Sequence, residues 1–301
     1  MGKFCFLVEN MRADSFLTEI KLKKFPFAKI EKTSIIAGIG SCFAEKFSQV
    51  LADSGLNVVI NPSGIIYNLY SIYEILKYVA ENHVFTAEEV DFINNRYILW
   101  SHHGCFGADV LQDVLNLANQ ELVKFRRQIV EADYFLLTPS SSVVYRHVKN
   151  NRIVANCHKA NNNDFQVELL SANENSQFLT EIFNIIKSIN PNCKVIISLS
   201  PIRHYPGDLV LNSRSKANLL SAIGDVAESF SDMAVYFPAY EIVHDELRDY
   251  RFYAKDMLHL SEFAEEYILQ KFCQWSMTED CQKFIAEVEK RKKLENHRKK
   301  Y

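Results

Sequence analysis

The chain has 301 residues, of which 48% are hydrophobic and 24% are charged, and its formal net charge is −3. This composition is that of a folded globular protein, and the small negative charge argues against a nucleic-acid-binding protein, which presents a broad basic face. The length suits one large α/β domain with additions.

The first third of the chain predicts two strands with helices after them. Residues 1–32 are expected to form an extended lead-in or an edge strand. Small and β-branched residues over 34–40 end in glycine, which is typical of a buried strand. Phe43 and Phe47 then recur at helical spacing, so Ser41 lies at a strand-to-helix turn. The next predicted elements are a strand over 58–60 and helices over 69–82, 86–95 and 109–132.

The remainder continues the alternation of short apolar strands and amphipathic helices. Strands are predicted over 134–138, 194–199 and 234–237, and helices over about 171–188 and 213–231. The polar, Asn-rich stretch at about 143–170 is expected to be an insertion with short strands. Such alternation predicts a mostly parallel sheet that helices cover on both faces. We expect one domain over 33–275 and a basic, solvated helix over 276–301.

Cysteine usage and the N-terminus bear on location. The seven cysteines are scattered without a Cys-x-x-Cys pair, so the sequence indicates neither a zinc site nor a disulfide framework. The apolar run near the N-terminus is too short for the core of a signal peptide, and no stretch approaches the length of a membrane span. We therefore expect a cytoplasmic protein that binds neither membrane nor nucleic acid.

A serine after the first strand and an acid–base pair near the far end suggest nucleophilic catalysis. Ser41 follows Gly38-Ile39-Gly40, and Asp256 stands three residues before His259. A hydroxyl becomes a useful nucleophile when a base removes its proton and a third group orients that base. We therefore expect Ser41 as the nucleophile, His259 as the base and Asp256 as the orienting acid.

Each of these residues also has a plain structural interpretation. Ser41 is a favoured helix cap, and Asp256 with His259 fits an exposed polar pair at a helix start. The Gly-x-Gly strand end resembles a phosphate-binding turn, but Phe43 stands where that fingerprint has its third glycine. Cys42 is a weaker candidate nucleophile, because a residue beside Ser41 would point elsewhere on the turn.

Other polar groups are predicted at the same edge, where ligands of parallel sheets bind. The N–H groups of Ser41 and Gly64, with the nearby carboxamide of Asn68, are candidates to stabilise an oxyanion. Arg203 and His204 follow the fourth strand, and Arg203 would bind an anionic substrate group or make a structural ion pair.

The pair His102-His103 has the look of a metal ligand, but no carboxylate lies beside it at ligand spacing. We therefore expect neither a metal nor another cofactor.

Several ordered blocks resemble the GSCFA family, a branch of the SGNH (GDSL-like) hydrolase superfamily. The first is the string Gly40-Ser41-Cys42-Phe43-Ala44 itself. Further blocks are Asn61-Pro62-x-Gly64-Ile65-x-Tyr67-Asn68, Val144-Tyr145-Arg146, Ala155-Asn156-Cys157-His158-Lys159, Ser200-Pro201-Ile202-Arg203-His204, Asn212-Ser213-Arg214-Ser215-Lys216-Ala217 and the stretch 236–253 before Asp256 and His259. The likeness runs from about residue 34 to 272.

The resemblance implies a flavodoxin-like three-layer α/β/α sandwich with the same serine, histidine and aspartate as its triad and Gly64 as an oxyanion glycine. One departure follows the third strand, where the family tends to carry Thr-Leu-Gly-Thr and this chain has Thr138-Pro139-Ser140-Ser141. Pro139 lacks a backbone donor and Ser140 replaces glycine. Asn68 or the hydroxyls of Ser140 and Ser141 are expected to substitute.

The expected function is that of a serine esterase or acyl hydrolase without a cofactor. Its substrate would be an O-acylated small molecule or carbohydrate, cleaved through a covalent acyl-enzyme. Two alternatives remain open. One is a non-catalytic binding protein on the same fold, suggested by the departure at 138–141. The other is an O-acyltransferase, which the aromatic residues and the Arg203-His204 pair allow.

Overall fold

The computed structural model describes residues 18–203 and 208–298, and five of its strands form one sheet. The strand order is β10-β9-β5-β1-β2, and every neighbouring pair is parallel. The strands are β1 (Ile35–Gly40), β2 (Asn57–Ile60), β5 (Tyr134–Thr138), β9 (Lys194–Ile197) and β10 (Ala234–Tyr236). Counted along the chain this is the order 2-1-3-4-5 of flavodoxin-like sheets, so the prediction of a mostly parallel sheet is confirmed.

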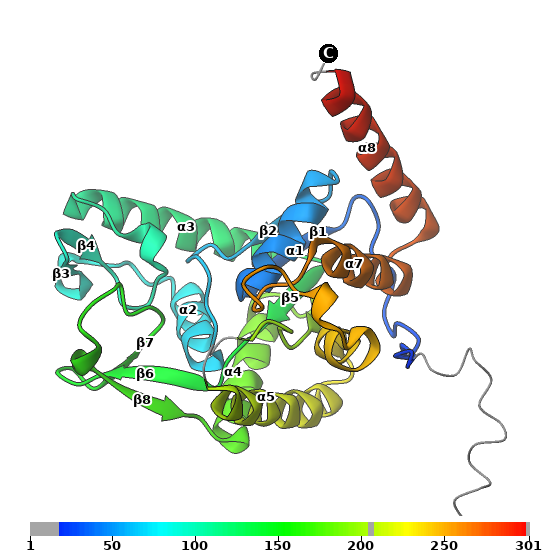
Figure 1. The fold of residues 1–301 in the computed structure, drawn as a ribbon. Helices are drawn as coiled ribbons and strands as arrows, with labels where there is room; N and C mark the ends of the chain where they lie inside the picture. Colours follow the sequence, from blue (N-terminus) through cyan, green and yellow to red (C-terminus); the bar gives the residue numbers. More distant parts are fainter. Residues whose placement is uncertain (1–17, 204–207, 299–301) are drawn as a thin grey trace, which may run out of the picture.

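Helices cover both faces of this sheet, which makes the three-layer sandwich (Figure 1). Because side chains alternate along a strand, Ala37 and Ile39 of β1 pack into one apolar core while Ile36 packs into the other. The first core is built with α2 (Leu69–Glu81), α3 (Leu111–Glu131), α4 (Ala172–Ile189) and α5 (Leu209–Ser229). The second core is built with α1 (Cys42–Asp53), α7 (Glu262–Ser276) and α8 (Glu279–Arg298).

A second, smaller sheet lies in the stretch expected to be an insertion. It is antiparallel, in the order β7-β6-β8, and comprises β6 (Val143–His147), β7 (Arg152–Val154) and β8 (Phe165–Leu169). In Figure 1 it lies beside α2, to which Arg152 is joined by an ion pair with Glu74 at 3.2 Å.

The helix predicted over 86–95 is wrong. The structure has a short 3₁₀ turn, Ala87–Glu89, and then an antiparallel hairpin of β3 (Asp91–Ile93) and β4 (Arg96–Ile98). Asn94 and Asn95 have φ angles of 51° and 62°. A two-residue hairpin loop of type I′ needs positive φ at both central positions, and asparagine tolerates it, so the turn overrides the weak helical spacing.

The remaining elements are short. They are the 3₁₀ turns Gly104–Phe106, Asn162–Asp164 and Tyr250–Phe252, the single turn α6 (Ala239–Glu241) and the π-helical turn Ile242–Leu247.

The lead-in meets the connection between α7 and α8. The N–H of Ile30 donates to the carbonyl of Ser276 at 2.8 Å, and the N–H of Thr278 donates to the carbonyl of Ile30 at 3.0 Å. These bonds tie the lead-in to the α7–α8 connection. From there α8 extends away from the body (Figure 1). Residues 1–17 of the expected lead-in and 299–301 of the expected C-terminal helix lie outside the described residues.

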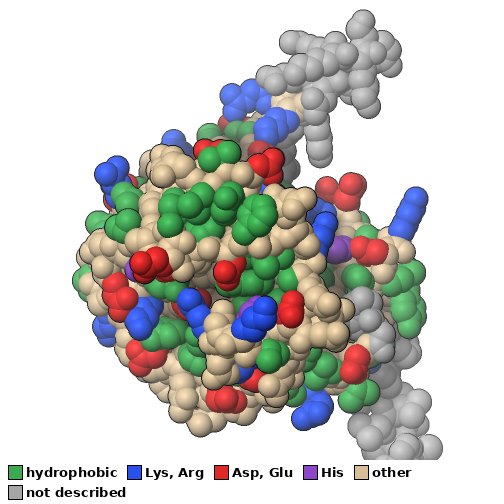
Figure 2. Space-filling model, turned by 90° about the vertical axis from the view of Figure 1, so that its left-hand side faces the viewer, with side chains coloured by type: hydrophobic (Ala, Val, Ile, Leu, Met, Phe, Trp, Pro, Cys, Tyr) green, Lys and Arg blue, Asp and Glu red, His purple; other side chains and the backbone are tan. Residues whose placement is uncertain are grey.

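The surface over the β3–β4 side of the molecule mixes acidic, basic and apolar side chains (Figure 2). Exposed apolar residues on this side include Phe92, which is 57% exposed. Within 18–203 and 208–298, none of the helices combines the length and the apolar character needed to cross a membrane.

Candidate active site

The turn between β1 and α1 is set by the close approach of β1 to β5. A Cβ added at Gly40 would lie 2.5 Å from the carbonyl oxygen of Thr138, so a larger residue would force the strands apart. The N–H of Ser41 donates to the same carbonyl at 3.0 Å, and the carbonyl of Ser41 accepts from the N–H of Glu45 at 3.1 Å. Both sides of the Ser41 backbone are therefore held within the fold.

The Ser41 side chain is turned into the protein. It is 0% exposed, and its Oγ has no hydrogen-bond partner among the described residues. Ser41 stands at the N-cap position of α1, but its side chain makes no capping hydrogen bond. The structure therefore shows neither a helix cap made by the Ser41 side chain nor a Ser41 hydroxyl that faces an imidazole.

The thiol of the next residue faces the imidazole instead. Cys42 Sγ lies 4.0 Å from His259 Nε2, and the Cys42 side chain is partly exposed. Burial raises the pKa of this thiol, while the N–H groups of Phe43 and of Cys42 itself and the charge of Lys216 lower it, and the net direction is upward.

The imidazole is held by a tight loop that Asp256 organises. Asp256 Oδ1 accepts from the N–H groups of Leu258 at 2.9 Å and His259 at 3.0 Å, and Oδ2 lies 2.6 Å from His259 Nδ1. The His259 hydrogen bond, followed by these two N–H groups, lowers the pKa of Asp256 to about 2. A carboxylate at Nδ1 selects the tautomer whose Nε2 is free to accept a proton. The side chains of His259 and Asp256 are 51% and 47% exposed, so the imidazole is open to solvent.

Packing on one face of the sheet brings these distant segments together. Leu260, next to His259, is buried in the same core as α1 and α7. The rings of Phe47 in α1 and Phe272 in α7 meet edge to face with centroids 5.0 Å apart. The loop that carries the predicted base, residues 253–261 (the base loop), leads directly into α7, so this packing places it over the start of α1.

The backbone donors predicted for the oxyanion are already used within the fold. The Ser41 N–H is bonded to Thr138, as described above, and the N–H of Gly64 donates to the carbonyl of Asn61 at 2.8 Å. Gly64 has φ +77°, and an added Cβ would lie 2.3 Å from Cβ of His103. Both the positive φ and the lack of space for a Cβ atom therefore require glycine at this position.

The other predicted side chains are also engaged. Asn68 Oδ1 caps α2 by accepting from the N–H of Ser71 at 2.8 Å. The Ser140 hydroxyl accepts from Lys216 Nζ at 3.4 Å, and the Ser141 hydroxyl accepts from the N–H of Val143 at 3.0 Å. Arg203 lies over the ring of Tyr253, 5.5 Å from its centroid. These contacts place Arg203 against the start of the base loop.

Two further predictions concern histidines. His204 lies outside the described residues. His102 is 1% exposed, its ring packs against Phe85 and Phe106, and burial lowers its pKa to about 3. His102 is thus a histidine of the apolar core.

A buried lysine at the site was missed from the sequence. Lys216 of α5 is 1% exposed, and its Nζ donates to the carbonyl of Ser200 at 2.7 Å and to Ser140 Oγ at 3.4 Å. Burial lowers its pKa to about 7, and the Cys42 thiol opposes this shift. A signal was present, because Lys216 stands three and seven residues before the buried Leu219 and Ile223, on the apolar side of the helix.

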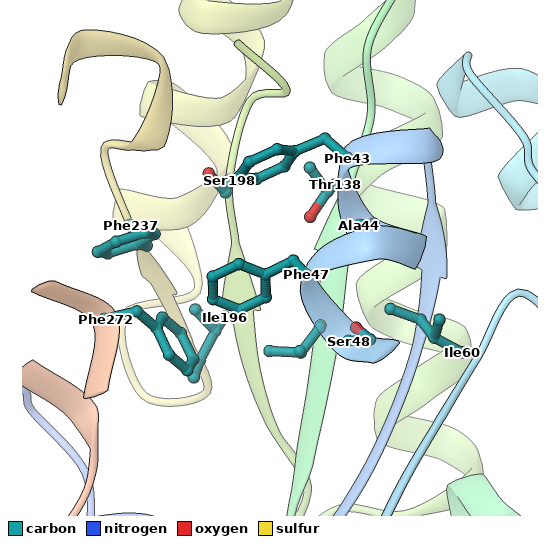
Figure 3. Close-up of a pocket in the computed structure, with 11 residues that line it drawn as sticks. Phe43, Ala44, Phe47, Ser48, Ile60, Thr138, Ile196, Ser198, Phe237 and Phe272 are labelled. Carbon is teal, nitrogen blue, oxygen red and sulfur yellow. The ribbon is translucent and has the colours of Figure 1, made fainter. Parts of the chain in front are cut away.

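A small cavity lies under α1 rather than at its start. Its volume is about 20 Å³, roughly the space for a single water molecule. Figure 3 shows the rings of Phe43, Phe47, Phe237 and Phe272 around it, with the hydroxyls of Ser48, Thr138 and Ser198 at its walls. Neither Cys42 nor His259 lines this cavity, so it is a packing gap of the core and no substrate pocket.

Comparisons with known proteins identify one family and several solved structures that the chain resembles. A family model described as the GSCFA family matches residues 35–272. No curated protein matches the chain. The solved structures that it resembles include the Clostridium thermocellum family 3 carbohydrate esterase, at 12% identity and TM-score 0.39, with 81% of this chain and 95% of that chain covered. Another is a family 3 carbohydrate esterase from Talaromyces cellulolyticus, at 11% identity and TM-score 0.38, with 86% and 99% covered.

A third similar structure is an acetyl xylan esterase from the rumen bacterium Butyrivibrio proteoclasticus. The identity is 9% and the TM-score 0.40, with 84% of this chain and 65% of that chain covered.

Proposed function

The chain belongs to the GSCFA family, and from this premise we propose that it is an acyl hydrolase that works through a covalent acyl-enzyme. The observation that carries the proposal is the Asp256–His259 pair, joined at 2.6 Å and held over the turn between β1 and α1. The hydrolase unit that we propose spans residues 33–275, with the insertion at about 143–170 and the C-terminal helix as additions.

The proposed chemistry needs three parts. A nucleophile of the β1–α1 turn, which carries Ser41 and Cys42, gives its proton to His259 Nε2 and attacks the carbonyl carbon of the substrate. Asp256 orients the imidazole and stabilises the imidazolium that forms. His259 then gives the proton to the departing alcohol, and water cleaves the acyl-enzyme with His259 as its base.

The surroundings of the base support a small or carbohydrate ester as the substrate. The half-exposed imidazole is reached from solvent, so the ester group is expected to lie near the surface. Tyr253 offers an aromatic face beside the base loop, with the Arg203 guanidinium over it. A polar acyl or sugar substituent would contact these residues.

A panel of esters tests the proposal, with aryl acetates and butyrates and O-acetylated sugars as substrates. We expect hydrolysis by the wild type and a loss of about 10²-fold or more in His259→Ala, the range that general-base catalysis supplies. The matched control is His83→Ala, because His83 also pairs with a carboxylate, Glu89 at 2.8 Å, on a different part of the molecule. Turnover that persists in His259→Ala, or a fully inert wild type, would contradict the proposal.

A further inference from the structure

We propose that Cys42, and not Ser41, is the nucleophile, so that the catalytic unit is a thiol, an imidazole and a carboxylate. The inference rests on the proposed function and assigns its attacking atom. The acyl-enzyme is then a thioester of Cys42 instead of an oxygen ester of Ser41.

The two side chains of the turn point in different directions, and only one of them reaches the base. Cys42 Sγ lies 4.0 Å from His259 Nε2, within the range of a long hydrogen bond to sulfur. Ser41 Oγ is fully buried without a partner among the described residues. To reach His259, Ser41 Oγ would have to leave this buried position, whereas Cys42 Sγ already faces the imidazole.

Cys42 also lies at the start of α1, where the helix stabilises a negatively charged nucleophile. It is the first residue of α1, where backbone N–H groups have no partner within the helix and the dipole favours negative charge. The N–H groups of Cys42 and Phe43 interact with the thiolate form, and so does the charge of Lys216. Donors for a developing anion therefore lie beside the sulfur, whereas the N–H groups of Ser41 and Gly64 are occupied.

Burial keeps the resting thiol neutral, since it raises the pKa of Cys42. The attack is therefore written with proton transfer. His259 Nε2 takes the thiol proton as sulfur bonds to the carbonyl carbon, whose π electrons move to oxygen. The oxyanion collapses, the carbon–oxygen single bond breaks, and the alcohol leaves with the proton from His259.

Water completes the cycle. It loses a proton to His259 as its oxygen attacks the thioester carbon, and the carbon–sulfur bond then breaks. The thiolate recovers the proton and the carboxylic acid departs, so no oxidant or other reactant is needed.

Substitutions at the two neighbouring positions separate the candidates. We expect Cys42→Ala to lose about 10²-fold or more of the ester hydrolysis and Ser41→Ala to stay within about threefold of the wild type, with both folds checked by circular dichroism. Intact-mass analysis after an activated acyl ester should show one acyl adduct that neutral hydroxylamine removes, as it does a thioester, and Cys42→Ala should lack it. Loss of activity in Ser41→Ala with retention in Cys42→Ala would overturn the inference and leave the proposed function standing.

Alkylation tests the thiol without any substrate. Iodoacetamide should modify Cys42 faster than Cys157, a partly buried thiol whose pKa burial raises to about 11, and His259→Ala should remove the difference. Equal rates at the two cysteines in the wild type would overturn the assignment of Cys42. A reactive, His259-dependent Cys42 together with an inert ester panel would instead contradict only the proposed function.

Discussion

Lys216→Met should remove a pH dependence from the stability of this protein. Lys216 is buried, and its pKa falls from the ordinary 10.5 to about 7. Because the folded-state pKa is the lower one, the unfolded chain binds more protons at every pH between these values. The free energy of unfolding of the wild type therefore rises with pH across this window through Lys216.

The size of this rise follows from the two pKa values. One pKa unit corresponds to about 1.4 kcal/mol, and between about pH 6.5 and pH 8.5 the lysine contributes an increase of about 2 kcal/mol. Methionine keeps an unbranched stem of similar volume but does not titrate, so Lys216→Met should lack this increase. All other titrating groups remain, so the comparison isolates Lys216 together with its influence on Cys42 and His244.

Urea unfolding of both proteins at the two pH values measures the difference. The matched control is Lys187→Met in α4, because Lys187 is 49% exposed and pairs with Asp232 at 3.4 Å on the surface. The control should follow the wild type. If Lys216→Met also follows the wild type from about pH 6.5 to 8.5, Lys216 is not a desolvated amine and the reasoning fails.

Three other predictions concern the base loop and the glycine of the second block. Asp256→Asn should lower kcat about 10²-fold or more at similar KM, because the amide keeps the Oδ1 acceptor for the Leu258 and His259 N–H groups but cannot fix the His259 tautomer. Activity within threefold of the wild type would exclude Asp256 as the group that orients His259. The pKa of Asp256 falls from 3.8 to about 2, so its stabilising effect should be lost only as the pH drops through that interval, and acid unfolding of Asp256→Asn should lack this step. Gly64→Ala should cost about 2–4 kcal/mol of stability, because of the positive φ at this position and the contact of the added Cβ with His103. The control Gly224→Ala should not destabilise α5, because nothing lies within 4 Å of its added Cβ. Equal unfolding midpoints for the two variants would refute this prediction.

Much of the architecture follows from local patterns in the sequence. The apolar run at 34–40 and the strands near 134, 194 and 234 predict a parallel sheet, because short buried strands alternating with helices have few other ways to pack. The family blocks and the Asp256-x-x-His259 spacing also depend only on neighbouring residues. The wrong prediction of a helix over 86–95 also came from a local pattern. The apolar spacing suggested a helix, but the two adjacent asparagines favour a turn.

The direction of each side chain at the site was decided by tertiary contacts. Ser41 and Cys42 are adjacent in sequence, but the Ser41 side chain is buried, whereas Cys42 Sγ lies 4.0 Å from His259 Nε2. The environment of Lys216 depends on Ser140 and Ser200, which follow β5 and β9 and lie 76 and 16 residues away along the chain. A sequence specifies which groups are present. Which of them share a space, and with what charge, depends on contacts between segments that only folding brings together.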